Sequence, residues 1–313
     1  MIRYAPWLFL MLSIFSCFRK KSPPKTIEPW LEQQFPGRFS VLNSNLKMLD
    51  VMAQFRGEKR ALVADKADPD VQFFLDWEKG VESLGLDTQT VTDAHARAKT
   101  DVAAARAWFG RLQQAGLEKF SAGVVGESLT VQAFSETTAP ERQRVLDRVR
   151  AALGKHSGQV PGVVFVEILE PAAFGTEYGN IIPRGHWETG TGWQRRNMIL
   201  SLRLEPEAET PAIWEYNPES TRCGQYRDDA FRQARVWADK NLPKPFFMDT
   251  NQMAAYDLKP KTPKGTGPAV GFSFPYFDKQ PAGESENEPR GYVYGVYYPE
   301  EQIFTEIRKQ REF

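Results

Sequence analysis

The segment Val163-Val164-Phe165-Val166-Glu167-Ile168-Leu169 is almost continuously apolar and rich in β-branched residues. A run of this length and composition predicts a β-strand that is covered on both faces. The residues before it predict a helix over 139–154, because Thr138 and Glu141 have the spacing of a capping box and Pro140 suits the first helical turn. A helix that leads into a buried strand indicates a layered fold, in which helices pack on a sheet.

The two faces of this helix differ in chemistry. We expect one face in the core, formed by Val145, Val149, Ala152 and Leu153. We expect the other face in solvent, because it carries four arginines: Arg142, Arg144, Arg148 and Arg150.

Two further segments have helical periodicity. Between residues 88 and 114, apolar side chains recur at three- and four-residue intervals, and Asp87 or Thr88 can cap the start. Residues 220–241 carry a second apolar stripe and are followed by Pro243, which cannot continue a helix.

Other segments have the composition of strands. Residues 198–204 alternate, which predicts one buried and one solvated face. Two aromatic segments, 269–277 and 291–298, predict an antiparallel hairpin near the C-terminus. Weaker strand candidates are residues 39–42, 60–64 and 123–134. Intermixed helices and strands that end in such a hairpin predict an α+β fold with a mixed sheet and packed helices.

Short sequence matches suggest an internal duplication within residues 27–170. The segment Leu31-Glu32-Gln33-Gln34 begins eight residues before Phe39-Ser40, and Leu112-Gln113-Gln114 begins eight residues before Phe120-Ser121. Because the similarity does not continue along the whole unit, chance is the alternative explanation. We expect a globular body over residues 27–313, either undivided or with lobes at 27–170 and 171–313.

Composition and charge limit the class of protein. The chain has 313 residues, of which 41% are hydrophobic, and its 40 Lys and Arg balance 40 Asp and Glu. These values are typical of a globular protein and exclude a collagen-like or disulfide-dense scaffold. The neutral charge lacks the basic excess of general nucleic-acid binders, so we expect no nucleic-acid partner.

The first 25 residues differ from the rest. Met1-Ile2-Arg3 is positively charged, residues 4–18 are uncharged and mostly apolar, and Arg19-Lys20-Lys21 follows. An apolar run of 15 residues is shorter than the roughly 20 that a membrane-spanning helix needs, and it suits the core of a signal peptide.

The run ends in Ile14-Phe15-Ser16-Cys17, which resembles the end of a bacterial lipoprotein signal. In that family a small residue precedes a cysteine that is lipidated and becomes the first residue of the mature chain. The resemblance implies a signal segment over 1–17, a lipid on Cys17, a basic tether over 18–26 and attachment to a membrane of the cell envelope, periplasmic or outer. It covers about the first 20 residues, and an uncleaved anchor or a buried helix of a cytoplasmic fold remains open.

The most suggestive candidate for chemistry is His186. In Arg184-Gly185-His186-Trp187-Glu188, His186 and Glu188 would share one face of an extended segment and could form an acid–base pair. In the alternative, the segment is a turn in which Trp187 and Trp193 contact a ligand. The chain lacks zinc-ligand spacings and phosphate-binding glycine loops, so we expect no metal and no cofactor.

Three other groups have both a structural and a functional interpretation. Cys223 lies near a predicted helix start, where a thiolate nucleophile could be stabilised, but a lone cysteine can also be packing material. Tyr292 and Tyr294 could stack on a flat ligand such as a sugar or pair in a core. His95 is expected on a helix flank, and the acidic group Asp65, Asp68 and Asp70 in a solvated turn.

These observations give two hypotheses of function. The first is a membrane-anchored envelope lipoprotein whose body is a binding or structural module for a protein or an envelope glycan. The alternative is an envelope hydrolase or transferase centred on His186 and Glu188.

Overall fold

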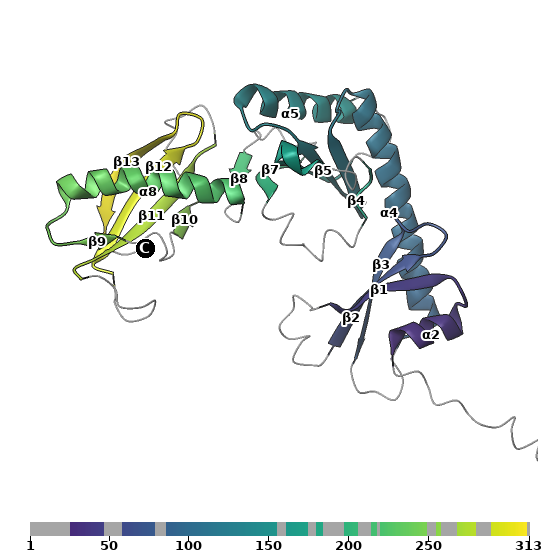
Figure 1. Ribbon diagram of the computed structural model, residues 1–313. Coiled ribbons are helices and arrows are strands. Elements are labelled where there is room, and N and C mark those ends of the chain that lie inside the picture. Colours follow the sequence, from purple (N-terminus) through teal and green to yellow (C-terminus); the bar gives the residue numbers. More distant parts are fainter. Residues whose placement is uncertain are drawn as a thin grey trace, which may run out of the picture. The chain divides into compact units, whose positions relative to one another are not determined.

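The computed structural model describes residues 26–46, 58–78, 86–154, 161–174, 180–183, 197–205, 214–217, 220–248, 255–257, 268–279 and 289–311 (Figure 1). In these ranges the chain forms four α-helices and three sheets. The fold is α+β, which confirms the sequence-based prediction. The chain divides into two compact units, Met1–Ala98 and Lys99–Phe313.

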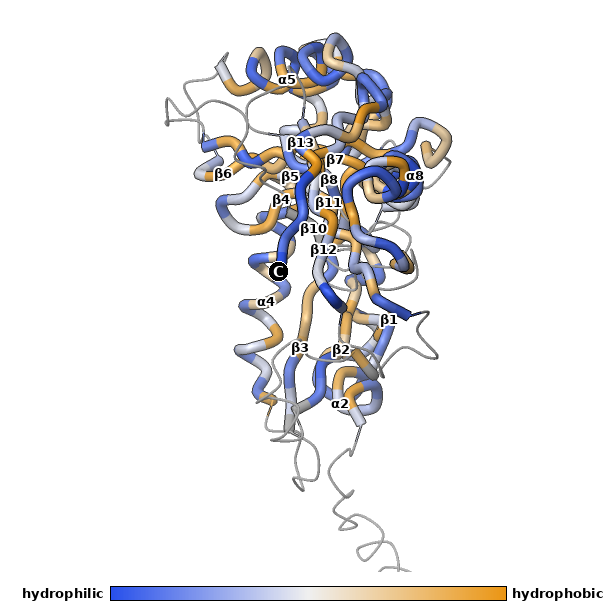
Figure 2. The backbone as a smooth tube through the Cα atoms, turned by 90° about the vertical axis from the view of Figure 1, so that its left-hand side faces the viewer, coloured by the Kyte–Doolittle hydropathy of each residue, from blue (hydrophilic) through white to orange (hydrophobic). Residues whose placement is uncertain are grey.

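The first unit is a small antiparallel sheet with two helical segments. It contains α2 (Ile27–Gln34), the neighbouring strands β1 (Phe39–Leu46), β2 (Glu58–Asp65) and β3 (Gln72–Glu78), and the start of α4 (Thr88–Gln114). Its core is formed by side chains that are at most 3% exposed: Ile27, Leu31, Val63, Phe73, Leu75 and Val91. Along α4, hydrophilic and hydrophobic residues alternate, as expected of an amphipathic helix (Figure 2).

The second unit begins with a mixed sheet. Its strand order is β4 (Phe120–Val125), β5 (Ser128–Phe134), β6 (Val163–Leu169), β7 (Met198–Leu204) and β8 (Trp214–Tyr216). Strands β5 and β6 are parallel and are connected through α5 (Ala139–Gly154), whereas the other neighbours are antiparallel. Val131, Val149 and Val166 lie in the core between this sheet and its helices. A short 3-10 helix, Pro171–Ala173, follows β6.

A fully antiparallel sheet completes the second unit. Its order is β10 (Ala255–Asp257), β11 (Val270–Phe277), β12 (Gly291–Tyr298) and β13 (Ile303–Gln310), and β9 (Phe247–Met248) also pairs with β11. Strands β11 and β12 form the predicted aromatic hairpin. Helix α8 (Thr221–Asn241) covers one face of this sheet, where Ala234 packs with Phe274 and Tyr297 (Figure 1).

The division into units differs from the one that the sequence suggested near residue 170. Strand β6 precedes that position and β7 follows it, yet the two are hydrogen-bonded neighbours in one sheet. The suggested duplication also does not correspond to matching topologies. Strands β1 and β2 are antiparallel neighbours, whereas β5 lies between β4 and β6 and is parallel to β6.

Three local expectations were wrong. Residues 123–134 are not one strand, because the chain turns at Gly126, which has φ +58°, between β4 and β5. Strand β6 is not covered on both faces, since Phe165 is 36% exposed. Arg142 does not face solvent: it is 5% exposed and its guanidinium contacts the Thr137 carbonyl and the Glu300 carboxylate.

Candidate functional site

Five of the residues singled out from the sequence lie outside the described ranges: Cys17, His186, Trp187, Glu188 and Trp193. The lipidation hypothesis and the acid–base pair therefore stay predictions.

Cys223 lies in the first turn of α8 and is fully buried. Its backbone N–H donates to the Ser220 hydroxyl at 3.0 Å, so Ser220 caps the helix. Burial raises the pKa of the Cys223 thiol to about 12, although Arg227 opposes this shift. A protonated thiol without solvent contact is a poor nucleophile, and the structure favours the packing interpretation.

The aromatic residues of the C-terminal hairpin occupy two different faces of the sheet. Phe272, Phe274 and Tyr276 are fully buried on the face that α8 covers, so this row is core. Tyr294 pairs with Ser273 and therefore lies on the other face, where it is 8% exposed and has the Arg308 guanidinium 4.5 Å from its ring centroid. Tyr292 is half-buried on that same face. Tyr294 is therefore almost inaccessible to a stacking ligand, whereas part of Tyr292 is accessible.

The sequence failed to predict a buried charged cluster in the first unit. His95 is 3% exposed; its Nε2 lies 2.7 Å from Asp65 Oδ2, and its Nδ1 lies 3.2 Å from an Arg38 guanidinium nitrogen. Arginine can only donate, so Nδ1 accepts and the Nε2–H donates to the carboxylate. The rings of Phe39 and Phe73 pack edge-on against the imidazole. Both ring nitrogens therefore have hydrogen-bond partners within the chain, so we assign the cluster a structural role.

The Asp65 carboxylate is ionised within this cluster. Burial acts to raise the pKa of Asp65, but hydrogen bonds from the Ala67 amide and from His95, together with electrostatic interactions with His95 and Arg38, lower it below the usual value. Asp65 is 7% exposed and not part of a solvated turn as expected.

A second charged cluster joins the mixed sheet to α8. The Arg222 guanidinium donates to both oxygens of Glu170, at 2.9 and 2.6 Å, and lies 3.8 Å from Glu136. Glu170 directly follows β6, and Glu136 comes two residues after the end of β5, so both lie near the carboxyl ends of these parallel strands, where α/β proteins often bind ligands. Here the two carboxylates bind Arg222 instead.

A row of polar side chains crosses the mixed sheet from edge to edge. The strand register places Ser121 opposite Gln132, Gln132 opposite Glu167, Glu167 opposite Ser201, and Ser201 opposite Glu215. Directly opposed residues have their side chains on the same face. We call these five residues the polar row.

The polar row lies on the face of the sheet away from α4 and α5. Those helices pack against the alternate residues of the strands, such as Val131 and Val166. On the polar face, Phe165 is two residues from Glu167 and therefore about 7 Å along the strand. Its 36% exposure leaves part of the aromatic ring accessible beside the row.

The centre of the polar row contains an unpartnered hydrogen-bond acceptor. Gln132 is 2% exposed and donates its amide N–H to Glu167 Oε2 at 2.8 Å. Its Oε1 atom is buried and accepts no hydrogen bond. Burial raises the pKa of the Glu167 carboxyl, and the hydrogen bond from Gln132 opposes this shift. A buried acceptor without a donor costs about 1–3 kcal/mol, so a donor that reached Gln132 Oε1 would stabilise the arrangement.

Among the residues described, no group of three or more His, Cys, Asp or Glu side chains is placed to hold a metal ion. Within the same part of the chain, no helix is both long and apolar enough to cross a bilayer. Comparison of the chain with protein-family models, with curated proteins and with solved structures gave no match in any of the three.

Proposed function

We propose that the protein is a membrane-anchored envelope lipoprotein whose body binds a hydroxyl-bearing ligand, an envelope glycan, on the polar row. The observation that carries the proposal is the buried, unpartnered Oε1 of Gln132. Support for the anchor comes from the lipoprotein-like sequence that ends at Cys17.

The chemistry of the row matches a sugar better than it matches a protein core. A core-facing sheet would carry apolar residues at these positions, because burying an amide and a carboxyl costs free energy. Sugar hydroxyls would donate to Gln132 Oε1 and to Glu167, and the hydroxyls of Ser121 and Ser201 can both donate and accept. The exposed part of the Phe165 ring offers an apolar surface on which a sugar ring can stack.

The test is a binding measurement on the full chain in detergent micelles. Chitohexaose and soluble peptidoglycan fragments are titrated by calorimetry into the wild type and into Gln132→Met, which keeps the side-chain length and removes the amide. We expect the variant to lose about tenfold or more in affinity, since it removes the acceptor and the partner of Glu167.

Gln143→Met is the matched control. Gln143 lies on α5, where its amide donates to Asp147 on the exposed side of the helix. This variant should bind as the wild type does, and thermal denaturation of both variants checks that they fold. Equal affinity of Gln132→Met and wild type, or no binding of either glycan by the wild type, would refute the proposal.

The envelope hydrolase or transferase centred on His186 and Glu188 remains a second proposal, and it rests on sequence alone. It predicts that the same glycans are cleaved or modified over time. It also predicts that His186→Gln abolishes the product in mass spectra of the reaction mixture.

A further inference from the structure

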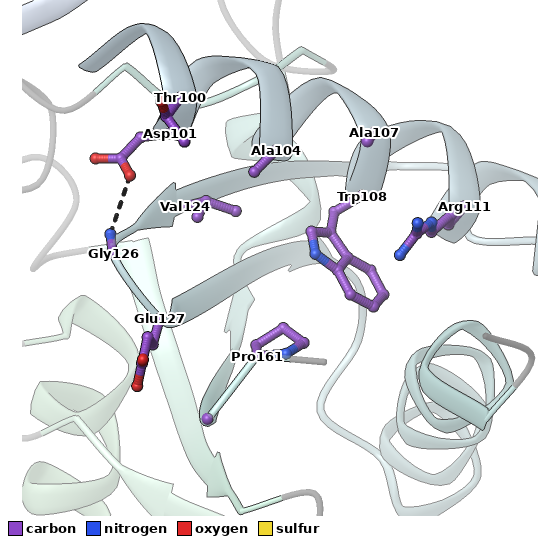
Figure 3. A pocket seen from close by; sticks show the side chains of 11 residues that line it. Thr100, Asp101, Ala104, Ala107, Trp108, Arg111, Val124, Gly126, Glu127 and Pro161 are labelled. Carbon is purple, nitrogen blue, oxygen red and sulfur yellow. Dashed lines mark hydrogen bonds between the residues drawn. The ribbon is translucent and has the colours of Figure 1, made fainter. Parts of the chain in front are cut away.

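A cavity of about 380 Å³ lies between α4 and the hairpin that connects β4 to β5 (Figure 3). This volume is within the range of small-ligand sites. One stripe of α4, from Thr100 to Arg111, forms a wall of the cavity, and the hairpin turn at Gly126 and Glu127 forms another. The cavity is separate from the polar row, because α4 packs on the other face of the sheet.

One end of the cavity carries two carboxylates. Asp101 Oδ1 accepts the N–H of Gly126 at 3.1 Å, which holds the hairpin turn beside the helix (Figure 3). An ionised carboxylate has about four acceptor positions, and the Gly126 N–H uses one of those on Asp101. The exposed Glu127 has its carboxylate next to Gly162, where an added Cβ would lie 3.5 Å from Glu127 Oε2. Two negative charges make this end selective for a cation.

The other end carries a fixed positive charge. The Arg111 guanidinium lies 4.6 Å from the centroid of the Trp108 ring, in cation–π contact. Trp108 is 5% exposed and belongs to the core, so its ring is held in place and in turn orients Arg111. A guanidinium oriented in this way can donate two parallel hydrogen bonds to a carboxylate.

The middle of the cavity is small and apolar. Ala104, Ala107 and Val124 line it between the two charged ends. Asp101 and Arg111 are ten positions apart on α4, which corresponds to about 15 Å along the helix axis. An extended peptide of about four residues has nearly this length.

We propose that this cavity binds a short extended peptide, with its ammonium group against Asp101 and Glu127 and its carboxylate against Arg111. A ligand with a single charge would match only one end. A polyanion such as a phosphate ester would be repelled by the two carboxylates, and a polyamine would be repelled by Arg111.

The test compares peptides whose ends are blocked. Tetraalanine, its N-acetyl form and its C-terminal amide are titrated into the full chain in detergent micelles, with calorimetry and tryptophan fluorescence as readouts. We expect tetraalanine to bind and each blocked form to bind about tenfold more weakly, because each loses a charge-assisted contact. The fluorescence change should disappear in Trp108→Phe.

Variants of the lining residues test which end of the peptide lies at which end of the cavity. Arg111→Gln should weaken tetraalanine about tenfold and remove the preference for the free carboxylate over the amide. Glu127→Gln should reduce the preference for the free amine. Ala104→Met should abolish binding, because its side chain fills the middle of the cavity. Arg106→Gln, an exposed α4 position outside the cavity lining, is the control and should leave all affinities unchanged.

The proposal fails if tetraalanine does not bind at millimolar concentration, if the blocked peptides bind equally well, or if Arg111→Gln keeps the preference for the carboxylate. Thermal denaturation identifies any variant that does not fold. If Ala104→Met does not fold, the result for Arg111→Gln decides whether the cavity binds the peptide. Glycan affinity, measured on the same samples, should not change in Arg111→Gln, so failure of this inference is distinct from failure of the polar-row proposal.

Discussion

Among the described residues of the first unit, the hydrogen-bonded contact between His95 and the Asp65 carboxylate is more buried than the ion pairs Arg60–Asp76 and Lys66–Glu32. Asp65→Asn keeps the size of the side chain but removes its charge, and leaves the Arg38–His95 contact without its carboxylate. Removing one partner of a buried pair costs about 3–5 kcal/mol. We expect a loss near the lower limit in urea denaturation at pH 7, because the asparagine oxygen can still accept one hydrogen bond. Asp93→Asn, on the exposed side of α4, should change stability by less than about 0.5 kcal/mol.

The same pair predicts how stability depends on pH. The pKa of Asp65 is lower in the folded chain than in the unfolded chain, so its contribution is fully present above the unfolded value, near pH 4. The contribution is lost as the pH falls through the folded value. The stability difference between wild type and Asp65→Asn should therefore shrink below about pH 4. A difference that stays constant from pH 7 to pH 2.5 would contradict this assignment.

Glu167 should have the opposite effect to Asp65 on how stability depends on pH. Burial raises its pKa in the folded chain, so the ionised carboxylate destabilises the fold above the folded pKa, and this penalty is absent below the unfolded value. Glu167→Gln removes the charge and can still accept the hydrogen bond from Gln132. We expect the Tm of the variant to exceed that of the wild type at pH 7 by about 2–4 °C, which corresponds to about 1 kcal/mol for a unit of this size.

At pH 4 the two proteins should have nearly equal Tm values, since Glu167 is then protonated in both the folded and the unfolded chain to a similar extent. Glu118→Gln, at an exposed position after α4, is the control and should have little effect at either pH. A Glu167→Gln variant that is less stable than the wild type at pH 7 would show that the carboxylate supports the fold. A destabilising carboxylate, by contrast, is typical of a position kept for binding.

At the scale of elements, close packing between β12 and β13 can be tested by replacing Gly295 with alanine. A Cβ at Gly295 would lie 2.4 Å from the Phe304 ring, which is 5% exposed and part of the core beneath α8. The ring cannot move away without displacing its neighbours, so Gly295→Ala should cost about 1–3 kcal/mol in urea denaturation.

Gly110→Ala is the matched control for this substitution. A Cβ at Gly110 meets no atom within 4 Å, and Gly110 lies inside α4. The same change should here stabilise the protein by about 0.5–1 kcal/mol, because alanine loses less backbone entropy in a helix than glycine does. If both substitutions changed stability in the same direction, the packing argument at Gly295 would be wrong.

The elements that the sequence predicted well are those whose signal is local. The bounds of α4, α5, β6, β7 and β12 agree with the segments expected from periodicity. Strand β13 was not predicted, because most of its residues are polar. They include Thr305, Glu306, Arg308 and Lys309. A strand of this composition forms only through pairing with a neighbour, which here is β12. Helix α2 was also not predicted as an element, since eight residues carry little periodicity.

The polar row could not be predicted from spacing. Its members come from five strands, and only the strand register brings them together. One signal was present in the sequence. Glu167 interrupts an otherwise apolar strand, where burying a carboxyl costs free energy unless the group is hydrogen-bonded or paired. The cavity beside α4 is a similar case, because Asp101 and Glu127 line one cavity only when the hairpin packs against the helix.

At the scale of the whole molecule, the neutral charge bears on the proposed attachment to a membrane. With 40 basic and 40 acidic residues, the chain as a whole has no net attraction to an anionic surface. In the proposed lipoprotein, stable attachment would then depend on the N-terminal segment, and one lipid chain alone anchors only weakly. The proposed tether over 18–26 would contribute the basic residues Arg19, Lys20, Lys21 and Lys25, which can add attraction to anionic headgroups.

Cys17→Ala tests this anchor directly. In a bacterial host, the wild type should sediment with membranes after a carbonate wash, and mass spectrometry should find a mature chain that begins at a lipid-modified Cys17. We expect Cys17→Ala to lose the lipid mass and to move to the soluble fraction. Cys223→Ala removes the other cysteine, which is buried in the core, and should keep both the lipid and the membrane association. An intact Met1 in the wild type would overturn lipidation. Continued sedimentation of Cys17→Ala with membranes would assign the anchor to the apolar run over residues 4–18. In that case hydrophobic contact of this run with the bilayer would hold the protein at the membrane without lipid.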